Sequence, residues 1–315
     1  MELTPFVTKL VAALEADDLA PGTITRTRID AAQFEEFLRG STGSDLDPND
    51  VQVATIDLQE FRGWLQRRDM TPGTIQRKFA SIRKALLLLA PEVALKLKWP
   101  KLPTQQLQAP SELGRNLRNA ILRAAESLSP RDECIIKMLL FTGARASTLA
   151  AARLSNVRLG ERSGEITYHA SSNKSNREYT VPLNSECRAA IRRYIAVRPE
   201  VEHDALLCSE RFPFDPVTRG VVWTVWHERM RALLPKQMQD RVHGPHQARH
   251  DLCRRLTSGE IGPDGIRRPP VAISDAAAIM GHSDPRVTAS VYSRPAPEDL
   301  KRALDELVGD EGEEV

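Results

Sequence analysis

Apolar residues recur every three or four positions through most of the first hundred residues, which is the spacing of helices that bury one face. Phe6, Leu10, Val11 and Leu14 form one such stripe. The polar run at 41–50 interrupts the pattern and is typical of a loop. The pattern therefore predicts four helices, over 6–18, 19–40, 55–69 and 70–90.

Two of these predicted helices begin with almost the same sequence. APGTITR at 20–26 is repeated as TPGTIQR at 71–77. A Pro-Gly turn followed by Thr starts a helix well, so the repeat indicates shared turn chemistry rather than a duplicated domain, with Thr23 as the expected cap of the second helix. The apolar stripe of that helix is expected to contain Ile24, Ile29, Phe34, Phe37 and Leu38.

The pattern changes after about residue 100. Three prolines and no helical period at 99–110 predict an extended linker. Beyond it, helices are expected at 112–128, 131–143, 184–197 and about 216–233, and the β-rich runs 165–170 and 177–183 predict a hairpin. The segment 258–270, with three Pro and three Gly, predicts an exposed loop, and 299–307 a last amphipathic helix. The expected domains are 1–103 and 111–315, joined by a linker at 104–110, in a mainly α fold with a small β-hairpin (α+β).

Composition narrows the class of protein. The 315 residues are 41% hydrophobic and 27% charged, which excludes a mostly disordered chain. No uncharged apolar run reaches the roughly 18 residues that a membrane span needs, and the N-terminus has no basic segment leading an apolar one, so a soluble cytoplasmic protein is expected. The four cysteines lie far apart, as buried thiols rather than a disulfide framework or zinc site.

The formal charge of +2 is the sum of strongly sorted segments. Residues 1–61 carry −8 and 62–101 carry +8, while 102–295 carry +8 and 296–315 carry −6. Such sorting is typical of a basic face for nucleic acid offset by an acidic remainder, although solvated helix faces produce it as well.

Three short clusters contain candidate chemistry. FTGARASTLAAARL places Gly143 just before Arg145, PHQARHDL places His246 and Arg249 three apart on one helix face, and IMGHSDPRVTASVYSR places a Gly-His pair ten residues before Tyr292. In isolation, the first is also typical of a helix that ends at a glycine, and the second of a solvated histidine pair. The sequence contains no phosphate-binding loop, dinucleotide fingerprint or HExxH motif.

Together the clusters resemble the tyrosine recombinase (phage integrase) family. That family has an Arg after a Thr-Gly turn, a Lys in a β-hairpin, a HxxR helix, a Gly-His pair and a nucleophilic Tyr. The matching positions, in chain order, are Arg145, Lys174, His246, Arg249, His282 and Tyr292. The N-terminal helices resemble the family's core-binding domain, so the resemblance covers nearly the whole chain.

The resemblance implies metal-free and ATP-free strand exchange through a 3′-phosphotyrosine and a Holliday junction, with no cofactor. Arg145 and Arg249 would clamp the phosphate, His246 and His282 would add donors, Lys174 would protonate the leaving oxygen, and Tyr292 would attack. It also implies a homotetramer on two double-stranded DNA sites, accessory recombination proteins and a mobile-element or replicon-resolving role. Phosphate contacts are expected from the basic stretch of the first domain: Arg77, Lys78, Arg83, Lys84, Lys96, Lys98 and Lys101.

Two departures from the family pattern leave alternatives open. Thr148 stands where the family commonly has an acidic residue that braces the site, and a hydroxyl does not stabilise an imidazolium by charge. The 258–270 segment also lengthens the path from the HxxR helix to Gly281-His282. One alternative is a DNA-binding accessory protein with weakened catalysis, and a weaker one is a type IB topoisomerase.

Overall fold

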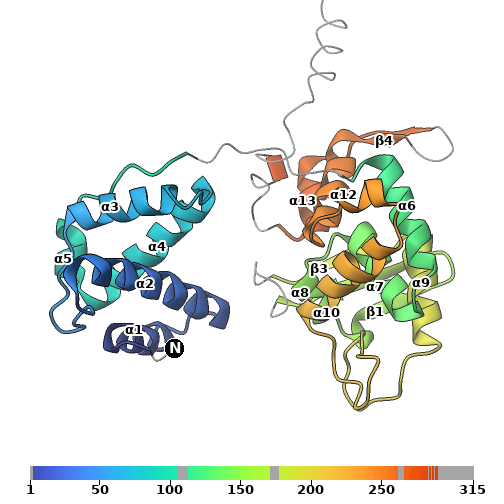
Figure 1. The fold of residues 1–315 in the computed structure, drawn as a ribbon. Coiled ribbons are helices and arrows are strands. Elements are labelled where there is room, and N and C mark those ends of the chain that lie inside the picture. The colour runs from blue at the N-terminus through green and yellow to red at the C-terminus, as the bar shows by residue number, and fades with distance from the viewer. Residues whose placement is uncertain are drawn as a thin grey trace, which may run out of the picture. The chain divides into compact units, whose positions relative to one another are not determined.

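The computed structural model describes residues 3–104, 113–170, 177–261 and 266–282, together with 284, 286, 288 and 289. The chain divides into two compact units, Met1–Leu107 and Gln108–Val315, each with its own hydrophobic core (Figure 1). Apart from residue 104, the linker expected at 104–110 lies outside the described residues.

The named elements in the described part of the first unit are all helices. Its elements are α1 (Pro5–Ala16), α2 (Pro21–Thr42), α3 (Thr55–Gln66), α4 (Pro72–Leu89) and α5 (Pro91–Lys96). An aromatic group formed by Phe34, Phe61 and Phe79 joins α2, α3 and α4, with ring centroids 5.0 Å apart for the first pair and 5.9 Å for the second. These rings are almost fully buried, so they anchor the core of this unit.

The repeated Pro-Gly-Thr sequence starts α2 and α4 alike, because Pro occupies the first position of each helix. Thr71 caps α4 by accepting a hydrogen bond from the amide of Thr74 at 3.3 Å. In α2 the cap position is Ala20, so Thr23 lies inside the first turn and the prediction that it caps the helix is wrong. Ile29 is 54% exposed and is likewise not part of the buried stripe.

The second unit combines helices with a small sheet. Its elements up to the last strand of this sheet are α6 (Gly114–Glu126), α7 (Pro130–Thr142), α8 (Ala146–Ala150), a 3₁₀ turn (Leu154–Asn156), β1 (Val157–Leu159), β2 (Gly164–Tyr168) and β3 (Tyr179–Pro182). They are followed by α9 (Ser185–Ile195), α10 (Arg219–Thr224), a π-helical turn (Val225–Met230), α11 (Lys236–Gln239), α12 (His246–Ser258), β4 (Glu260–Ile261), β5 (Arg267–Arg268) and α13 (Ile273–Met280). Helix α7 forms the centre of this unit, since even its charged side chains are buried.

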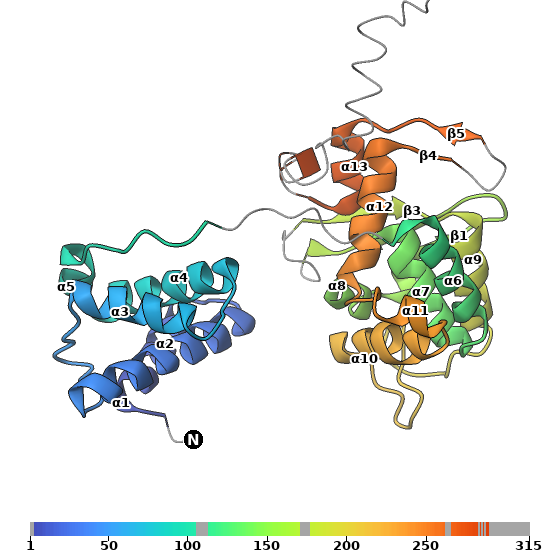
Figure 2. The same cartoon turned by 45° about the horizontal axis from the view of Figure 1, so that its top comes forward.

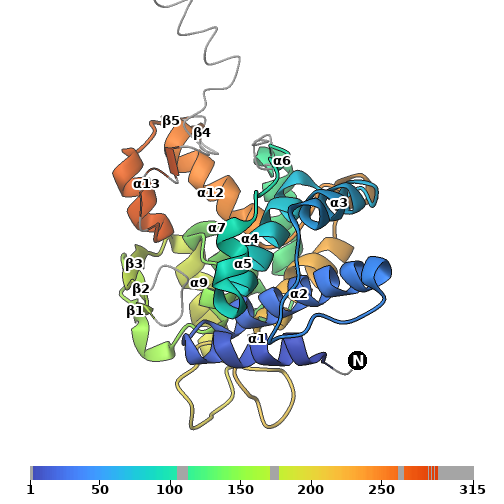
Figure 3. The same ribbon diagram turned by 90° about the vertical axis from the view of Figure 1, so that its left-hand side faces the viewer.

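The three-stranded sheet is antiparallel in the order β1-β2-β3. Tyr168 pairs with Tyr179 at the end of the β2–β3 hairpin where the connection joins the two strands, and Glu165 pairs with Pro182 at the open end. Figure 3 shows this sheet beside α13, which contacts β3. The hairpin expected from 165–170 and 177–183 is therefore present.

The segment 258–270 is not simply a loop. Glu260 pairs with Arg268 in a second antiparallel hairpin, β4–β5, which Figure 2 shows beside α12 and α13. Gly259 begins it with φ +75°, where an added Cβ would lie 2.6 Å from the carbonyl oxygen of Arg268. Two-residue strands among prolines and glycines carry no periodic signal, which is why the sequence predicted a loop.

The predicted fold class, mainly α with a small antiparallel sheet, is confirmed. All four cysteines are buried free thiols, as expected. Within the described ranges, no helix is long and apolar enough to cross a membrane. The expected helix at 299–307 lies outside the described residues.

Candidate active site

The Thr-Gly turn at the end of α7 presents Arg145. Gly143 ends α7 with φ +63°, a backbone conformation that favours glycine. An added Cβ there would also lie only 2.9 Å from Cε of Met280, so a side chain at this position would clash. Thr142 shares a 3.1 Å hydrogen bond with the hydroxyl of Tyr168 and accepts one from the amide of Ala144, which ties this turn to β2. The turn therefore fixes Arg145 at the N-cap position of α8.

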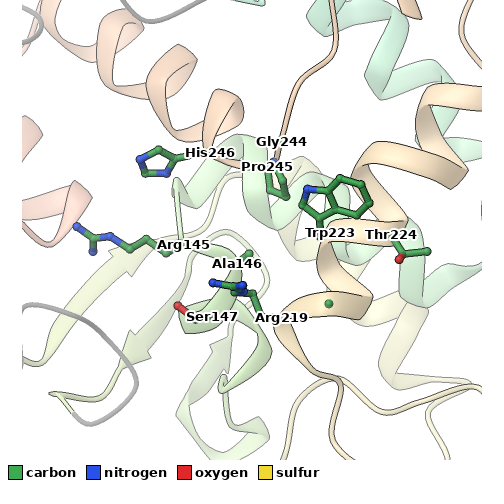
Figure 4. A pocket seen from close by; sticks show the side chains of 10 residues that line it. Arg145, Ala146, Ser147, Arg219, Trp223, Thr224, Gly244, Pro245 and His246 are labelled. Atoms are coloured by element: carbon green, nitrogen blue, oxygen red, sulfur yellow. The ribbon is translucent and has the colours of Figure 1, made fainter. Parts of the chain in front are cut away.

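Arg145 and His246 line one pocket of about 780 Å³ on the surface of the second unit (Figure 4). The Nη1 atom of Arg145 is buried and has no hydrogen-bond partner among the described residues. Within the part of the chain that the structure describes, no acidic residue lines this pocket, while Arg219 adds a second guanidinium. An unpaired guanidinium and an imidazole in an open, positively charged hollow suit an oxyanion such as a phosphate.

Helix α12 begins at His246 because Gln247 locks the preceding turn. Its side-chain amide accepts from the amide of His243 at 3.0 Å and donates to the carbonyl of Arg241 at 3.0 Å. The His243 carbonyl in turn accepts from the indole of Trp226 at 2.9 Å. His246 and His250 share the face of α12, with ring centroids 4.6 Å apart. The turn thus places His246 at the mouth of the pocket, where its ring is exposed.

Arg249 lies one turn along α12 and is only 3% exposed. Its Nη1 donates to the carbonyl oxygen of Gly143 at 2.7 Å, and its Nη2 donates to that of Met280 at 2.5 Å. These carbonyls belong to the C-terminal ends of α7 and α13. One guanidinium therefore joins the two turns that precede Arg145 and His282.

His282 follows a second glycine turn. Gly281 ends α13 with φ +60°, and the His282 amide donates back to the Ala277 carbonyl at 2.9 Å. An added Cβ on Gly281 would lie 2.7 Å from the ring of Tyr179, so only glycine fits this contact. The imidazole Nδ1 of His282 shares a 2.7 Å hydrogen bond with the hydroxyl of Thr288, which is fully buried and fixes the ring.

Tyr179 extends the site from β3. Its hydroxyl is buried beside Arg145 and Arg249, and burial raises its pKa while the two guanidiniums oppose the rise. The ring packs on Tyr168 with a centroid separation of 5.3 Å. Tyr179 thus packs its ring against the Gly281 turn and places its hydroxyl near both arginines.

The surroundings keep the three histidines of the site neutral. Desolvation by the packed protein, reinforced by the neighbouring positive charges, lowers the pKa of both His246 and His282 to about 4. The pKa of His250 is lowered as well, by desolvation and by Arg249. Thr148 is fully buried, and its hydroxyl has no hydrogen-bond partner among the described residues. A neutral hydroxyl at this position does nothing to raise the histidine pKa values.

A buried charge network holds α12 against α6 and the β4–β5 hairpin. Asp251 accepts from Arg118 on α6 at 3.0 Å and from Arg255 at 3.1 Å. Glu260 of β4 accepts from the same two arginines. Asp251 lies two residues from Arg249, so the inserted hairpin is connected to the helix that carries the site.

Lys174 and Tyr292 lie outside the described residues. Where the two strands lead into their connection, Nδ1 of His169 lies 2.8 Å from a carboxylate oxygen of Glu178, next to the Tyr168–Tyr179 pair. The structure thus brings together Arg145, His246, Arg249 and His282 of the six predicted positions. It adds Tyr179, Arg219 and Trp223, which the sequence analysis did not place in the site.

The basic residues expected to contact DNA differ in their surroundings. Asp30, which is 1% exposed, accepts hydrogen bonds from Arg77, Lys78 and Ser81. Lys78 is buried at 6% exposure, so its ammonium neutralises Asp30 inside the unit. Arg77 is partly exposed although it is bonded to Asp30, and the other side chains that are exposed or partly exposed are Arg83, Lys84, Lys96, Lys98 and Lys101.

The chain belongs to the phage integrase family: the model of that family matches residues 113–299, which span the described site residues. Its members are DNA strand-transferring enzymes. The chain is 25% identical to tyrosine recombinase XerD of Vibrio cholerae over 268 residues, covering 81% of each chain. It is 25% identical to tyrosine recombinase XerC of Chlorobaculum parvum over 333 residues, covering 96% of this chain and 93% of that one.

The fold is similar to that of solved recombinase structures. The XerH site-specific recombinase bound to its difH substrate, in a pre-cleavage complex, matches with a TM-score of 0.65 at 13% identity, covering 96% of this chain and 95% of that one. The integrase of transposon Tn1549 with a circular intermediate DNA matches with a TM-score of 0.64 at 17% identity, covering 96% and 99%.

Proposed function

We propose that this protein is a site-specific DNA recombinase that cleaves and rejoins duplex DNA through a 3′-phosphotyrosine on Tyr292. The Nη1 atom of Arg145, which has no hydrogen-bond partner among the described residues, lies at an open pocket with His246 and follows a turn that Arg249 braces, and this supports a phosphodiester as the substrate. The relatives support DNA as the partner, since they are tyrosine recombinases and one of the similar structures is bound to its DNA substrate.

The proposed reaction needs neither metal nor ATP. The Tyr292 oxygen attacks phosphorus, the Oη–P bond forms, and the P–O5′ bond breaks with its electron pair leaving on O5′. Lys174 supplies the proton to O5′, and His246 accepts the proton from the tyrosine. Arg145, Arg249 and His282 stabilise the charge on the nonbridging oxygens. Return of the phosphate to a DNA hydroxyl regenerates the enzyme.

The assignment of Tyr292 as the nucleophile rests on the burial and hydrogen bonding of the other three tyrosines. Tyr168 is 1% exposed and its hydroxyl is bonded to Thr142. Tyr194 is 3% exposed and its hydroxyl accepts from the amide of Cys208 at 2.9 Å. The hydroxyl of Tyr179 is buried under the site. Burial raises the pKa of all three, so each is a poor nucleophile, and Tyr292 is the fourth tyrosine of the chain.

The low histidine pKa values fit a site that is completed by its substrate. A bound phosphate brings negative charge next to His246 and His282, which raises the pKa of each. His246 then becomes a better proton acceptor once DNA is in place. Arg145 and Arg249 supply the main positive charge for the phosphate.

The first unit is proposed as the core-binding domain, with Arg83, Lys84, Lys96, Lys98 and Lys101 as phosphate contacts. Lys78 is left out because it is buried against Asp30, and Arg77 is left out because its guanidinium is paired with the same carboxylate. The working form is proposed to be a homotetramer on two DNA sites in the cytoplasm, exchanging strands in pairs through a Holliday junction, with accessory proteins setting direction. These features follow from the family resemblance.

Covalent capture from a DNA library tests the proposed function without knowledge of the target site. The probe is a pool of 40-bp duplexes with randomised sequence, each nicked so that a released strand end diffuses away and traps the covalent complex. Protein-linked DNA is recovered after denaturation and sequenced. The proposal expects a recurrent sequence with the wild type and none with Tyr292→Phe. Relaxation of any plasmid without sequence preference would favour a topoisomerase, and sequence-specific binding without covalent DNA would favour an accessory protein.

A further inference from the structure

The C-terminal end of α7, which leads into Arg145, receives hydrogen bonds from two arginines of α12. The helix ends at Thr142, so its last carbonyl groups need partners from outside the helix. Arg249 donates to the carbonyl of Gly143 at 2.7 Å, and Nη2 of Arg255 donates to the carbonyl of Leu140 at 3.0 Å. Positive side chains at this end also complement the helix dipole. The position of the turn therefore depends on both guanidiniums.

Arg255 is itself held by two carboxylates. Its Nε donates to Asp251, one turn earlier on α12, at 3.1 Å, and its Nη1 donates to Glu260 of β4 at 3.3 Å. Since Nη2 is bonded to Leu140, all three nitrogens of this guanidinium have a partner. A planar guanidinium with three bonded nitrogens is fixed in one orientation.

The two carboxylates are shared with a second arginine, which balances the charge. Arg118 of α6 donates to Asp251 at 3.0 Å and is also bonded to Glu260. Arg118 and Asp251 are 7% and 4% exposed, so little solvent screens the network. Glu260 uses one carboxylate oxygen for each arginine. Without its charge, two guanidiniums would share the single carboxylate of Asp251, and Arg255 would lose part of its support.

Glu260 comes from the inserted β4–β5 hairpin, which is tied to α12 where it begins and where it ends. Gly259 follows α12 directly, and an added Cβ there would lie 2.6 Å from the carbonyl oxygen of Arg268 on the opposite strand. After the hairpin, the amide of Val271 donates to the carbonyl of Leu256 at 2.8 Å. Figure 2 shows the hairpin beside α12. The backbone thus holds Glu260 next to the two arginines.

We propose that the inserted β4–β5 hairpin positions the proposed catalytic arginine: Glu260 fixes Arg255, and Arg255 fixes the end of α7 that presents Arg145. Glu260 and Arg255 are therefore positioning residues, which act without touching DNA. This inference rests on the proposed function, because it takes Arg145 as a phosphate-binding residue. A guanidinium that is oriented in advance stabilises a transition state better than a mobile one, so loss of Glu260 slows the reaction more than it weakens DNA binding.

A second network of the same composition provides a matched control. Glu210 is bonded to Arg131 at 3.3 Å and to Arg229 at 3.0 Å, again with one carboxylate oxygen for each arginine. Both arginines are also bonded to Asp132, which lies in the first turn of α7. Glu210→Gln therefore disturbs the same kind of network at the opposite end of the same helix.

Hydrogen exchange of the full chain without DNA tests whether the hairpin holds the turn. Glu260→Gln replaces one acceptor oxygen by a donor and removes the charge. Amides in the segment 141–146 are expected to exchange at least about fivefold faster in this variant than in the wild type, because the turn opens more often. Glu210→Gln is expected to leave their exchange within about twofold of the wild type.

The rate of covalent-complex formation tests the consequence for catalysis, with a duplex recovered by covalent capture. At saturating DNA, Glu260→Gln is expected to be about tenfold slower than the wild type, with its Kd for the duplex changed less than about twofold. Glu260→Asp, which keeps the charge, is expected to recover part of the rate. Because Glu260 acts through Arg255, the double variant with Arg255→Gln should be no slower than Arg255→Gln alone.

Two results would overturn the proposal. Equal effects of Glu260→Gln and Glu210→Gln on exchange at 141–146 and on the rate would show that the hairpin only stabilises the fold. Independent, multiplying effects of Glu260→Gln and Arg255→Gln would show that Glu260 does not act through Arg255. If the wild type captures no DNA, the proposed function fails, and unchanged exchange in Glu260→Gln would separately show that the hairpin does not hold the turn.

Discussion

Arg249 donates a hydrogen bond to the backbone carbonyl of Gly143, 2.7 Å away, so one predicted phosphate-binding arginine holds the turn that presents the other. The same guanidinium binds the Met280 carbonyl and thereby holds the turn before His282. These contacts orient three side chains before any substrate arrives, which is the condition for strong electrostatic stabilisation of a transition state.

Replacing Arg249 tests this double role. Arg249→Lys keeps the charge but loses the planar fork, so at most one carbonyl keeps its partner. We expect covalent-complex formation to fall at least 100-fold and the free energy of unfolding to fall by about 1–3 kcal/mol. The rate is measured with the captured duplex and the stability by urea titration. The exposed Arg162→Lys serves as the control, and a loss of rate without any loss of stability would show that Arg249 braces nothing.

Gly143 and Gly281 have positive φ values, and neither turn leaves room for a side chain, so glycine is required at both positions. Gly281→Ala places a Cβ at positive φ and 2.7 Å from the Tyr179 ring, so we expect a loss of at least about 2 kcal/mol in unfolding free energy. Gly40→Ala, inside α2 with open space around it, should instead raise stability by about 0.5–1 kcal/mol. Equal effects of the two substitutions, measured by thermal or urea unfolding, would contradict this account of the site.

Stability should depend on pH through His246 and His282, whose pKa values the fold lowers. The pKa values of His246 and His282 fall from 6.5 to about 4 on folding, so the unfolded chain binds more protons between these values. Stability contributed by the neutral rings is therefore complete above about pH 6.5 and is lost as the pH falls toward 4. Urea titrations from pH 4 to 8 should show this slope, and His282→Gln should flatten it. An unchanged slope in that variant would mean that His282 is not the titrating group.

Thr148 offers a direct check on the missing acidic residue. Its hydroxyl is buried and without a partner among the described residues, which costs the fold free energy. Thr148→Val removes this cost at similar volume, so we expect stability to stay equal or rise by up to about 1 kcal/mol, with the cleavage rate within threefold of the wild type. A rate loss of 100-fold would show that the hydroxyl braces a catalytic group.

Substitution should distinguish the exposed basic residues of the first unit, which are proposed to bind DNA, from the buried Lys78, which stabilises the fold. Lys98→Gln removes an exposed charge and should lower the salt slope of DNA binding by about one without changing stability. Lys78→Gln leaves Asp30 with one cation fewer in a buried site, so it should lower stability by at least about 1 kcal/mol and leave the salt slope unchanged. The reverse pattern would place the DNA face on the Lys78 side of α4.

Short sequence motifs predict much of the site, because each of its turns is formed by residues that are close together in the chain. Gly143 and Gly281 end helices just before Arg145 and His282, and His246 and Arg249 share a helix face three residues apart, so all four positions follow from short motifs. Lys78 was misleading because it flanks the apolar stripe of α4, and only Asp30 on another helix reveals that it is buried. Arg219 and Trp223 reach the pocket through packing between distant segments, which no spacing within α10 predicts.

Peptide mapping of the trapped complex tests the central claim most directly. Nuclease trims the bound DNA to a short 3′-linked remnant, and mass spectrometry locates that remnant on the tryptic peptides. The account predicts a phosphodiester adduct on Tyr292, in the peptide that follows Arg286. An adduct on Tyr179, whose hydroxyl lies beside the two arginines, or on any other residue would contradict it.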